Sequence, residues 1–106
     1  IALIEEGQPV IVIVPSPRDA DSLHPKVISN IQEIRARGAK VIAVAEDGDS
    51  TVADYSEHVI YVPQSENIFS AILNVIPLQT FALELSQAKG LDVDQPRNLA
   101  KSVTVE

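Results

Sequence analysis

The chain has 106 residues, of which 45% are hydrophobic, and a formal net charge of −7 at pH 7. This length allows one domain with its own hydrophobic core, and the apolar content excludes an intrinsically disordered chain. The negative charge argues against general binding of nucleic acids or anionic membranes, because such binding depends mainly on a surplus of Lys and Arg.

No cysteine occurs in the chain, which excludes disulfides and thiolate chemistry and agrees with a reducing compartment. The N-terminal segment IALIEEGQPV has no signal-peptide features, and no apolar run reaches the length of a membrane span. We therefore expect a soluble, cytoplasmic protein with no membrane partner. Because the chain starts at Ile1 and contains no methionine, we also expect it to be a fragment.

The first half of the chain predicts a strand followed by a helix. Residues 9–15, PVIVIVP, form a continuous β-branched run, which is typical of a parallel-sheet strand covered on both faces. Pro25 suits the first turn of a helix, and Gly38 suits its C-terminal cap. Between them, four apolar residues recur at helical spacing opposite a polar side, and so predict an amphipathic helix: Val27, Ile28, Ile31 and Ile34.

The second half predicts two more strands and a long helix. KVIAVA at residues 40–45 and HVIYV at 58–62 are strand patterns, with a short helical piece at 52–55 between them. The connection is long enough for a parallel crossover. Residues 68–89 are apolar nearly all round and stop before Gly90. We expect this last helix to be buried or to lie at an interface.

Pro77 falls inside the last predicted helix, where it removes one main-chain hydrogen bond. We expect one helix with a kink near Leu73; two helices that meet there are the alternative. The order of elements predicts a three-layer α/β fold with a parallel sheet. Three strands and two long helices leave an apolar strand edge open, so we expect part of the fold to lie outside this chain.

Polar residues follow the first two predicted strands. Ser16 and Arg18 could hold a phosphate, and the turn at 46–49, EDGD, could bind a cation or a ribose at the carboxyl edge of the sheet. Ordinary loop chemistry and a solvated turn shaped by its Asp-Gly pair are the preferred interpretations. No spacing supports a metal site. His24 and His58 have no nucleophile nearby in the sequence, so we expect them to be structural or exposed.

The last fifteen residues, DVDQPRNLAKSVTVE, fit neither a helix nor a strand pattern. They predict a short irregular lid that carries Arg97 and Lys101. From composition alone, Lys101 is a solvated charge near a chain end. A lysine amine acts as a nucleophile at neutral pH when it is desolvated or close to another cation, for which Arg97 is a candidate. Arg97 and Asn98 could equally order the tail by bonding carbonyls or nearby aspartates.

This tail resembles, through all fifteen residues, the C-terminal tail of the isomerising glutamine–fructose-6-phosphate aminotransferases, or glucosamine-6-phosphate synthases. Upstream, GQPVIVI, IQEIRARGAKVIAVA and IPLQTFALELSQAKG follow the order of the second sugar isomerase (SIS) subdomain of that family. The resemblance implies the second half of a flavodoxin-like SIS fold at residues 1–90. It also implies an active-site tail at residues 91–106. The first strands and their phosphate-binding serine loop would then be absent.

The resemblance also implies a function. The family converts fructose 6-phosphate and glutamine into glucosamine 6-phosphate and glutamate, without a cofactor or metal. Its lysine at the position of Lys101 engages the open-chain sugar carbonyl. The neighbouring tail residues form part of the sugar site's wall, which implies substrate binding by Arg97, Asn98, Leu99 and Ala100.

Other parts of that family's machinery are expected to be missing. The glutaminase cysteine, the proton-transferring glutamate and the ring-opening histidine precede this segment in the family, so we expect the chain alone to be inactive. Glutamine would bind to an absent N-terminal domain, and the family forms homodimers through its SIS domains. A stand-alone SIS sugar-phosphate isomerase or deaminase is one alternative. A non-catalytic module that binds sugar phosphates is the other.

Overall fold

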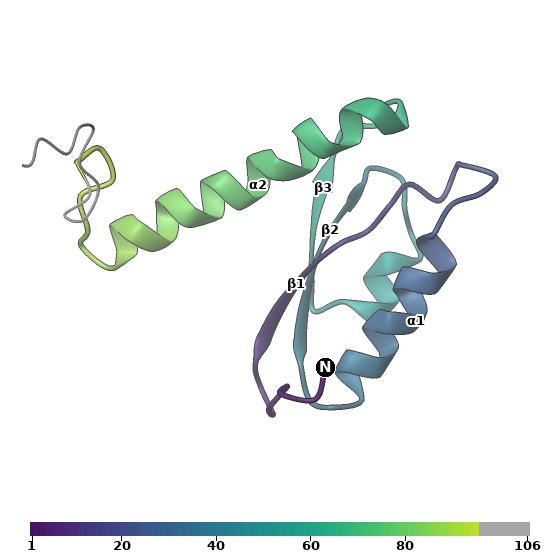
Figure 1. Cartoon of the computed structure of the whole chain (residues 1–106), viewed down its shortest axis with the longest axis horizontal. Coiled ribbons are helices and arrows are strands. Elements are labelled where there is room, and N and C mark those ends of the chain that lie inside the picture. The colour runs from purple at the N-terminus through teal and green to yellow at the C-terminus, as the bar shows by residue number, and fades with distance from the viewer. Residues whose placement is uncertain (96–106) are drawn as a thin grey trace, which may run out of the picture.

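A computed structural model describes residues 1–95 of the chain. Its elements are β1 Pro9–Ile13, α1 His24–Arg35, β2 Lys40–Glu46, the short 3-10 helix η1 Val52–Tyr55, β3 His58–Val62 and α2 Asn67–Ala88. The strands form one parallel sheet in the order β1-β2-β3 (Figure 1). This confirms the predicted α/β fold with a parallel sheet, and the element ends differ from the predicted ones by a few residues.

Helix α1 packs against one face of the sheet. Successive residues of a strand point to opposite faces, so alternate residues of β1 and β2 meet the apolar side of α1. Ile31, at the centre of this contact, is fully buried, which contributes roughly 1.5–3 kcal/mol relative to exposure. The core cluster combines residues of α1 and β2 with one residue just beyond β1 and one in η1. Its buried members are Val14, Ile28, Ile31, Ile34, Val41, Ala43, Ala45 and Val52.

The turn after α1 depends on a glycine, as predicted. Gly38 has φ +88°, a left-handed conformation that residues with a Cβ adopt at a cost. In this conformation Ala39 donates its N–H to the carbonyl of Ile34 at 3.2 Å, which satisfies one of the last helical carbonyls. The chain then enters β2 at Lys40 without a further loop.

The second face of the sheet is covered only at the carboxyl ends of its strands. Helix α2 contacts β2 and β3 there, and Val44 and Val62 are buried. Ile11 and Ile60, farther from that end, are 37% and 41% exposed, and Ile13, the last residue of the edge strand β1, is 46% exposed. The expectation that the first strand is covered on both faces is therefore wrong for the described residues, because α2 leaves the sheet after its first turns.

Helix α2 is one continuous element of 22 residues with Pro77 inside it. The alternative of two helices is therefore wrong, while the kink near Leu73 stays a prediction. None of its residues is buried, and Figure 1 shows the helix extending away from the sheet. The radius of gyration, 17.1 Å, exceeds the roughly 13 Å of a compact domain of this size. The sequence predicted that this helix is buried or lies at an interface. Burial is wrong for residues 1–95, and a position at an interface stays a prediction.

By length and composition, α2 could also cross a membrane. Its best 18-residue window has a mean hydropathy of 1.6 and is 0% buried. The prediction that no apolar run reaches such a length is thus wrong by this measure. Polar residues such as Asn74 and Gln79 interrupt the apolar run, but the mean hydropathy of the helix stays high. A single helix of this kind is weak support for a membrane span, since core helices of soluble proteins have the same composition.

Candidate functional site

The loops that follow the three strands meet at one edge of the sheet. Arg18, five residues after β1 ends, forms an ion pair with Glu46, the last residue of β2. The same guanidinium nitrogen, Nη2, donates to the carbonyl oxygen of Ser65 in the loop after β3, at 3.1 Å. One arginine therefore connects the carboxyl ends of all three strands, the edge at which open α/β sheets bind ligands.

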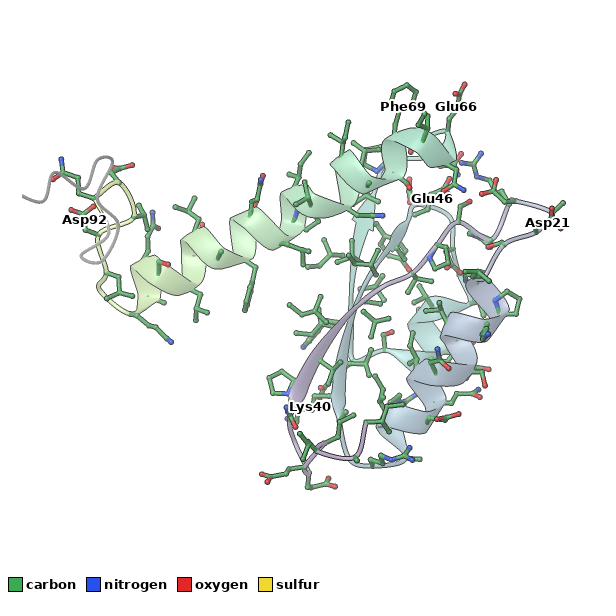
Figure 2. The ribbon with its side chains drawn as sticks, in the orientation of Figure 1. Asp21, Lys40, Glu46, Glu66, Phe69 and Asp92 are labelled. Atoms are coloured by element: carbon green, nitrogen blue, oxygen red, sulfur yellow. The ribbon has the colours of Figure 1, made fainter. Side chains whose placement is uncertain are left out.

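Glu46 is buried at this edge, with 8% exposure, while the Arg18 side chain is 51% exposed. A buried carboxylate is costly unless a cation or hydrogen-bond donors compensate its charge. In Figure 2, Glu46 lies near the first turn of α2, where Glu66 and Phe69 are labelled. The expectation of a solvated turn is therefore wrong for Glu46, because α2 and the loops cover it.

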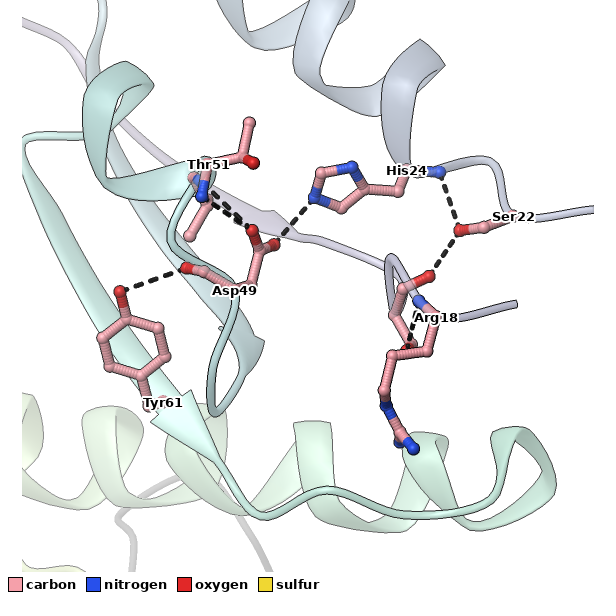
Figure 3. A network of polar contacts seen from close by, with 8 residues as sticks. Arg18, Ser22, His24, Asp49, Thr51 and Tyr61 are labelled. Carbon is pink, nitrogen blue, oxygen red and sulfur yellow. Dashed lines mark hydrogen bonds and ion pairs between the residues drawn. The ribbon is translucent and has the colours of Figure 1, made fainter. Parts of the chain in front are cut away.

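Asp49 is also buried, at 3% exposure, and it has a partner on α1. Its Oδ2 lies 2.7 Å from Nε2 of His24. Its Oδ1 accepts the backbone N–H groups of Thr51 at 3.0 Å and Val52 at 3.3 Å. Gly48 has φ +90° and supplies the turn geometry, as predicted. The solvated-turn interpretation is nevertheless wrong for Asp49, whose carboxylate joins the turn to α1 (Figure 3).

His24 is structural, in agreement with the sequence-based expectation. It is 6% exposed and begins α1, and its backbone N–H donates to the Ser22 hydroxyl at 3.0 Å. That hydroxyl donates to the carbonyl of Ser16, so the loop after β1 is connected to the start of α1 (Figure 3). In a strand–helix–strand unit, the start of the helix lies at the carboxyl edge of the sheet. The order of the predicted elements was therefore the sequence signal for a contact between His24 and Asp49.

A mainly apolar hollow of about 480 Å³ lies between the end of β1 and α2, and two further hollows lie along this edge. The first of these two has a volume of about 20 Å³ and lies between the loop after β1, the end of β2 and the first turns of α2. The second, of about 280 Å³, is lined by residues on both sides of the Arg18 contact: Arg18, Asp19, Gln64, Ser65, Glu66 and Asn67. Within residues 1–95, no three His, Cys, Asp or Glu side chains gather in a way that could hold a metal ion.

The five tail residues predicted to meet the sugar lie outside the described part of the chain: Arg97, Asn98, Leu99, Ala100 and Lys101. The preceding residues are described up to Gln95. After Gly90 they form no regular helix, and Asp92 Oδ1 accepts the backbone N–H groups of Asp94 and Gln95, each at 3.0 Å. The described start of the tail is therefore irregular, as predicted.

The SIS domain model matches residues 1–88, which is most of the chain. The chain belongs to the SIS domain family. The match includes α2 to its last residue, so this apolar helix is part of the SIS domain. That placement favours packing against protein over a membrane span.

Several relatives of this SIS domain are bacterial aminotransferases. The chain is 68% identical over all 106 residues to a glutamine–fructose-6-phosphate aminotransferase (isomerizing) from Leifsonia xyli, and 64% identical to one from Corynebacterium diphtheriae. In each case it covers 17% of the relative's length. This SIS domain chain therefore corresponds to a part of those enzymes, and the predicted resemblance is confirmed.

A solved structure supports the same assignment. The C-terminal domain of glucosamine-fructose-6-phosphate aminotransferase from Francisella tularensis superposes with a TM-score of 0.75 and 32% sequence identity. The superposition covers 90% of this chain and 26% of that one. The SIS-type fold expected from the sequence is thus confirmed.

Proposed function

We propose that this chain is part of the isomerase domain of an enzyme that converts fructose 6-phosphate and glutamine into glucosamine 6-phosphate and glutamate. The observation that supports it most is the 68% identity over the whole chain to an isomerizing glutamine–fructose-6-phosphate aminotransferase. The match spans all 106 residues, so it includes the loops and the tail as well as the core. The activity belongs to the whole protein, because the chain matches 17% of the relative.

Within that enzyme we assign the carbonyl chemistry to Lys101. Its amine would attack the carbonyl carbon of open-chain fructose 6-phosphate, and loss of water would give a Schiff base. The amine must be neutral to attack, and a nearby cation such as Arg97 favours the neutral form. Asn98, Leu99 and Ala100 would form the wall of the sugar site. What supports these roles is the tail sequence DVDQPRNLAKSVTVE.

The proposal extends to partners and location. Glutamine would bind to a separate domain of the whole protein, and a second copy would associate through the SIS domains. The open face of the sheet and the exposed apolar side chains of α2 favour such association. A cytoplasmic location agrees with bacterial relatives that act in amino-sugar metabolism and with a chain that lacks cysteine. The reaction as proposed requires no cofactor.

The test replaces Lys101 in the full-length protein that carries this chain. Lys101→Ala and Lys101→Arg should each lower glucosamine 6-phosphate formation by more than roughly a hundredfold, since positioned proton-transfer and nucleophilic groups contribute at least that much. Glutamine hydrolysis, measured separately, should persist. Lys89→Ala is the matched control, because Lys89 is an exposed lysine at the end of α2.

A trapping experiment distinguishes the alternatives. Borohydride reduction in the presence of fructose 6-phosphate should add the reduced sugar to the peptide that contains Lys101, as measured by mass spectrometry. Conversion of a sugar phosphate without glutamine would favour a stand-alone isomerase or deaminase. Binding without conversion, in both wild type and Lys101→Ala, would favour a non-catalytic module.

A further inference from the structure

The loop at 63–66, between β3 and α2, is the base from which α2 starts, and two hydrogen bonds tie it to the neighbouring loops. Arg18 Nη2, in the loop after β1, donates to the carbonyl oxygen of Ser65 at 3.1 Å. Gln64 Nε2 donates to the carbonyl oxygen of Asp47, in the turn after β2, at 2.9 Å. Because the base is only four residues long, these two bonds fix the direction in which the chain enters α2.

A buried carboxylate holds Arg18 against this base. Glu46, the last residue of the central strand β2, is 8% exposed and forms an ion pair with the same guanidinium nitrogen. Its Oε1 has no hydrogen bond of normal geometry within residues 1–95, so Arg18 is the cation that compensates its charge. A guanidinium is planar and has five N–H donors, so it can hold a carboxylate and a carbonyl at fixed positions. Arg18 therefore connects the base of α2 to the end of the central strand.

The direction set at the base decides where α2 ends. After its first turns the helix leaves the sheet (Figure 1), and none of its residues is buried in the described part of the chain. At 1.5 Å per residue, its 22 residues span about 33 Å. A tilt of about 10° at the base therefore moves the far end by about 6 Å. Residues 91–95, the described start of the tail, lie just beyond that end.

We propose that Arg18 is a positioning residue for the carbonyl chemistry assigned to Lys101. By fixing the base of α2, Arg18 fixes the point at which the tail segment that carries Lys101 begins. This inference rests on the proposed function, because the direction of α2 affects the reaction only if the tail takes part in it. A misplacement of about 1 Å in a reacting group can cost about a hundredfold in rate. A tilt of a few degrees at the base is therefore enough to lower turnover.

The first test measures turnover of the full-length protein. Arg18→Met should lower kcat for glucosamine 6-phosphate formation by at least roughly tenfold, with a smaller change in the KM of fructose 6-phosphate and unchanged glutamine hydrolysis. Arg18→Lys keeps the charge and can donate to the same two acceptors, so it should recover part of the loss. Arg35→Met is the matched control, because Arg35 also donates to a backbone carbonyl, that of Asp54 at 3.1 Å, but lies on α1. It should leave kcat unchanged.

The second test measures the direction of α2 without using the reaction. Spin labels are attached after Glu33→Cys on α1 and Gln87→Cys near the end of α2, both at exposed positions. They are introduced into full-length protein whose other cysteines have been replaced, and the distance between them is measured by pulsed electron paramagnetic resonance. Arg18→Met should shift or broaden the distance distribution, and Arg35→Met should leave it unchanged.

Three results would overturn the proposal. They are an unchanged kcat in Arg18→Met, an equal loss of kcat in Arg18→Met and Arg35→Met, and an unchanged distance distribution in Arg18→Met. Failure of the Lys101 assignment is recognised separately, because Lys101→Ala would then retain its activity. The spin-label distances would still show whether Arg18 sets the direction of α2.

Discussion

At the scale of single residues, Asp49 does the most to shape the carboxyl edge of the sheet. Its carboxylate contacts His24 on α1 and caps two backbone N–H groups of its own turn. Its carbonyl accepts a hydrogen bond from the Tyr61 hydroxyl on β3 at 3.4 Å. One acidic residue thus fixes the positions of a helix, a turn and a strand relative to one another.

His24→Leu should loosen the turn after β2. The change removes a buried hydrogen-bond partner of a carboxylate, which costs about 2 kcal/mol. Because Asp49 also holds the backbone N–H groups of Thr51 and Val52, hydrogen exchange at these two amides in the full-length protein should become faster. His58→Leu, at an exposed position of β3, is the control. Unchanged exchange in His24→Leu would mean that the two backbone bonds alone hold the turn.

Gly38→Ala should be more destabilising than Gly90→Ala. Both glycines have positive φ, +88° and +69°, and alanine pays about 1 kcal/mol or more in that conformation. A Cβ at position 38 would also lie 2.9 Å from the Cα of Glu6, whereas among residues 1–95 a Cβ at position 90 meets nothing within 4 Å. Thermal melting of the two variants in the full-length protein measures the difference. A similar loss in both would show that the N-terminal segment moves aside at little cost.

At the scale of elements, α1 and α2 differ in what stabilises them. Helix α1 buries Ile28, Ile31 and Ile34 against the sheet, so its own chain supplies the packing. Helix α2 has no buried residue in this chain and carries Pro77, which leaves one carbonyl in the preceding turn without its N–H partner. Because isolated helices are marginal in water, we expect contacts beyond those described for residues 1–95 to stabilise α2.

Pro77→Ala should strengthen α2. Alanine restores the missing N–H to the ladder and is roughly 3 kcal/mol more favourable than proline in a helix interior. Hydrogen exchange of the α2 amides near Leu73 and Pro77 should slow in the full-length protein. Gln79→Ala, at an exposed site with an intact N–H, should change exchange little. Faster exchange in Pro77→Ala would show that the surroundings of α2 require a bend at the proline.

At the scale of the whole molecule, the chain exposes more apolar surface than a stable monomer normally does. One face of the sheet is open at Ile11, Ile13 and Ile60, and α2 presents large apolar residues such as Ile72, at 63% exposure, and Phe69. Contiguous exposed apolar surface of this kind marks an interaction site. Since the relatives are about six times as long as the matched part, other parts of such a protein are the expected cover.

The isolated chain should therefore self-associate. Sedimentation velocity should show a mass that increases with concentration, because the uncovered face and α2 bury apolar area in any contact between copies. Ile72→Glu should shift the distribution toward monomer, and Lys26→Glu, on the exposed side of α1, should not. A monomer at every concentration would mean that α2 folds back onto the open sheet face when alone.

The sequence by itself determined the elements and the parallel sheet, because strand and helix periodicity and the glycine at position 38 are local signals. The SIS family followed from the resemblance of the tail and the upstream segments to known sequences, and the family match confirms it. The tail residues assigned to the sugar come from the same resemblance and stay a prediction, because they lie outside the described residues. The tertiary structure decided which polar residues are buried. The strand–helix–strand order brings the start of α1 to the same edge as Asp49, but it does not identify which side chains are buried there. The partners of Glu46 and Asp49, Arg18 and His24, lie more than twenty residues earlier. The free energy of a buried charge depends on groups brought together by the fold, and sequence spacing does not record that proximity.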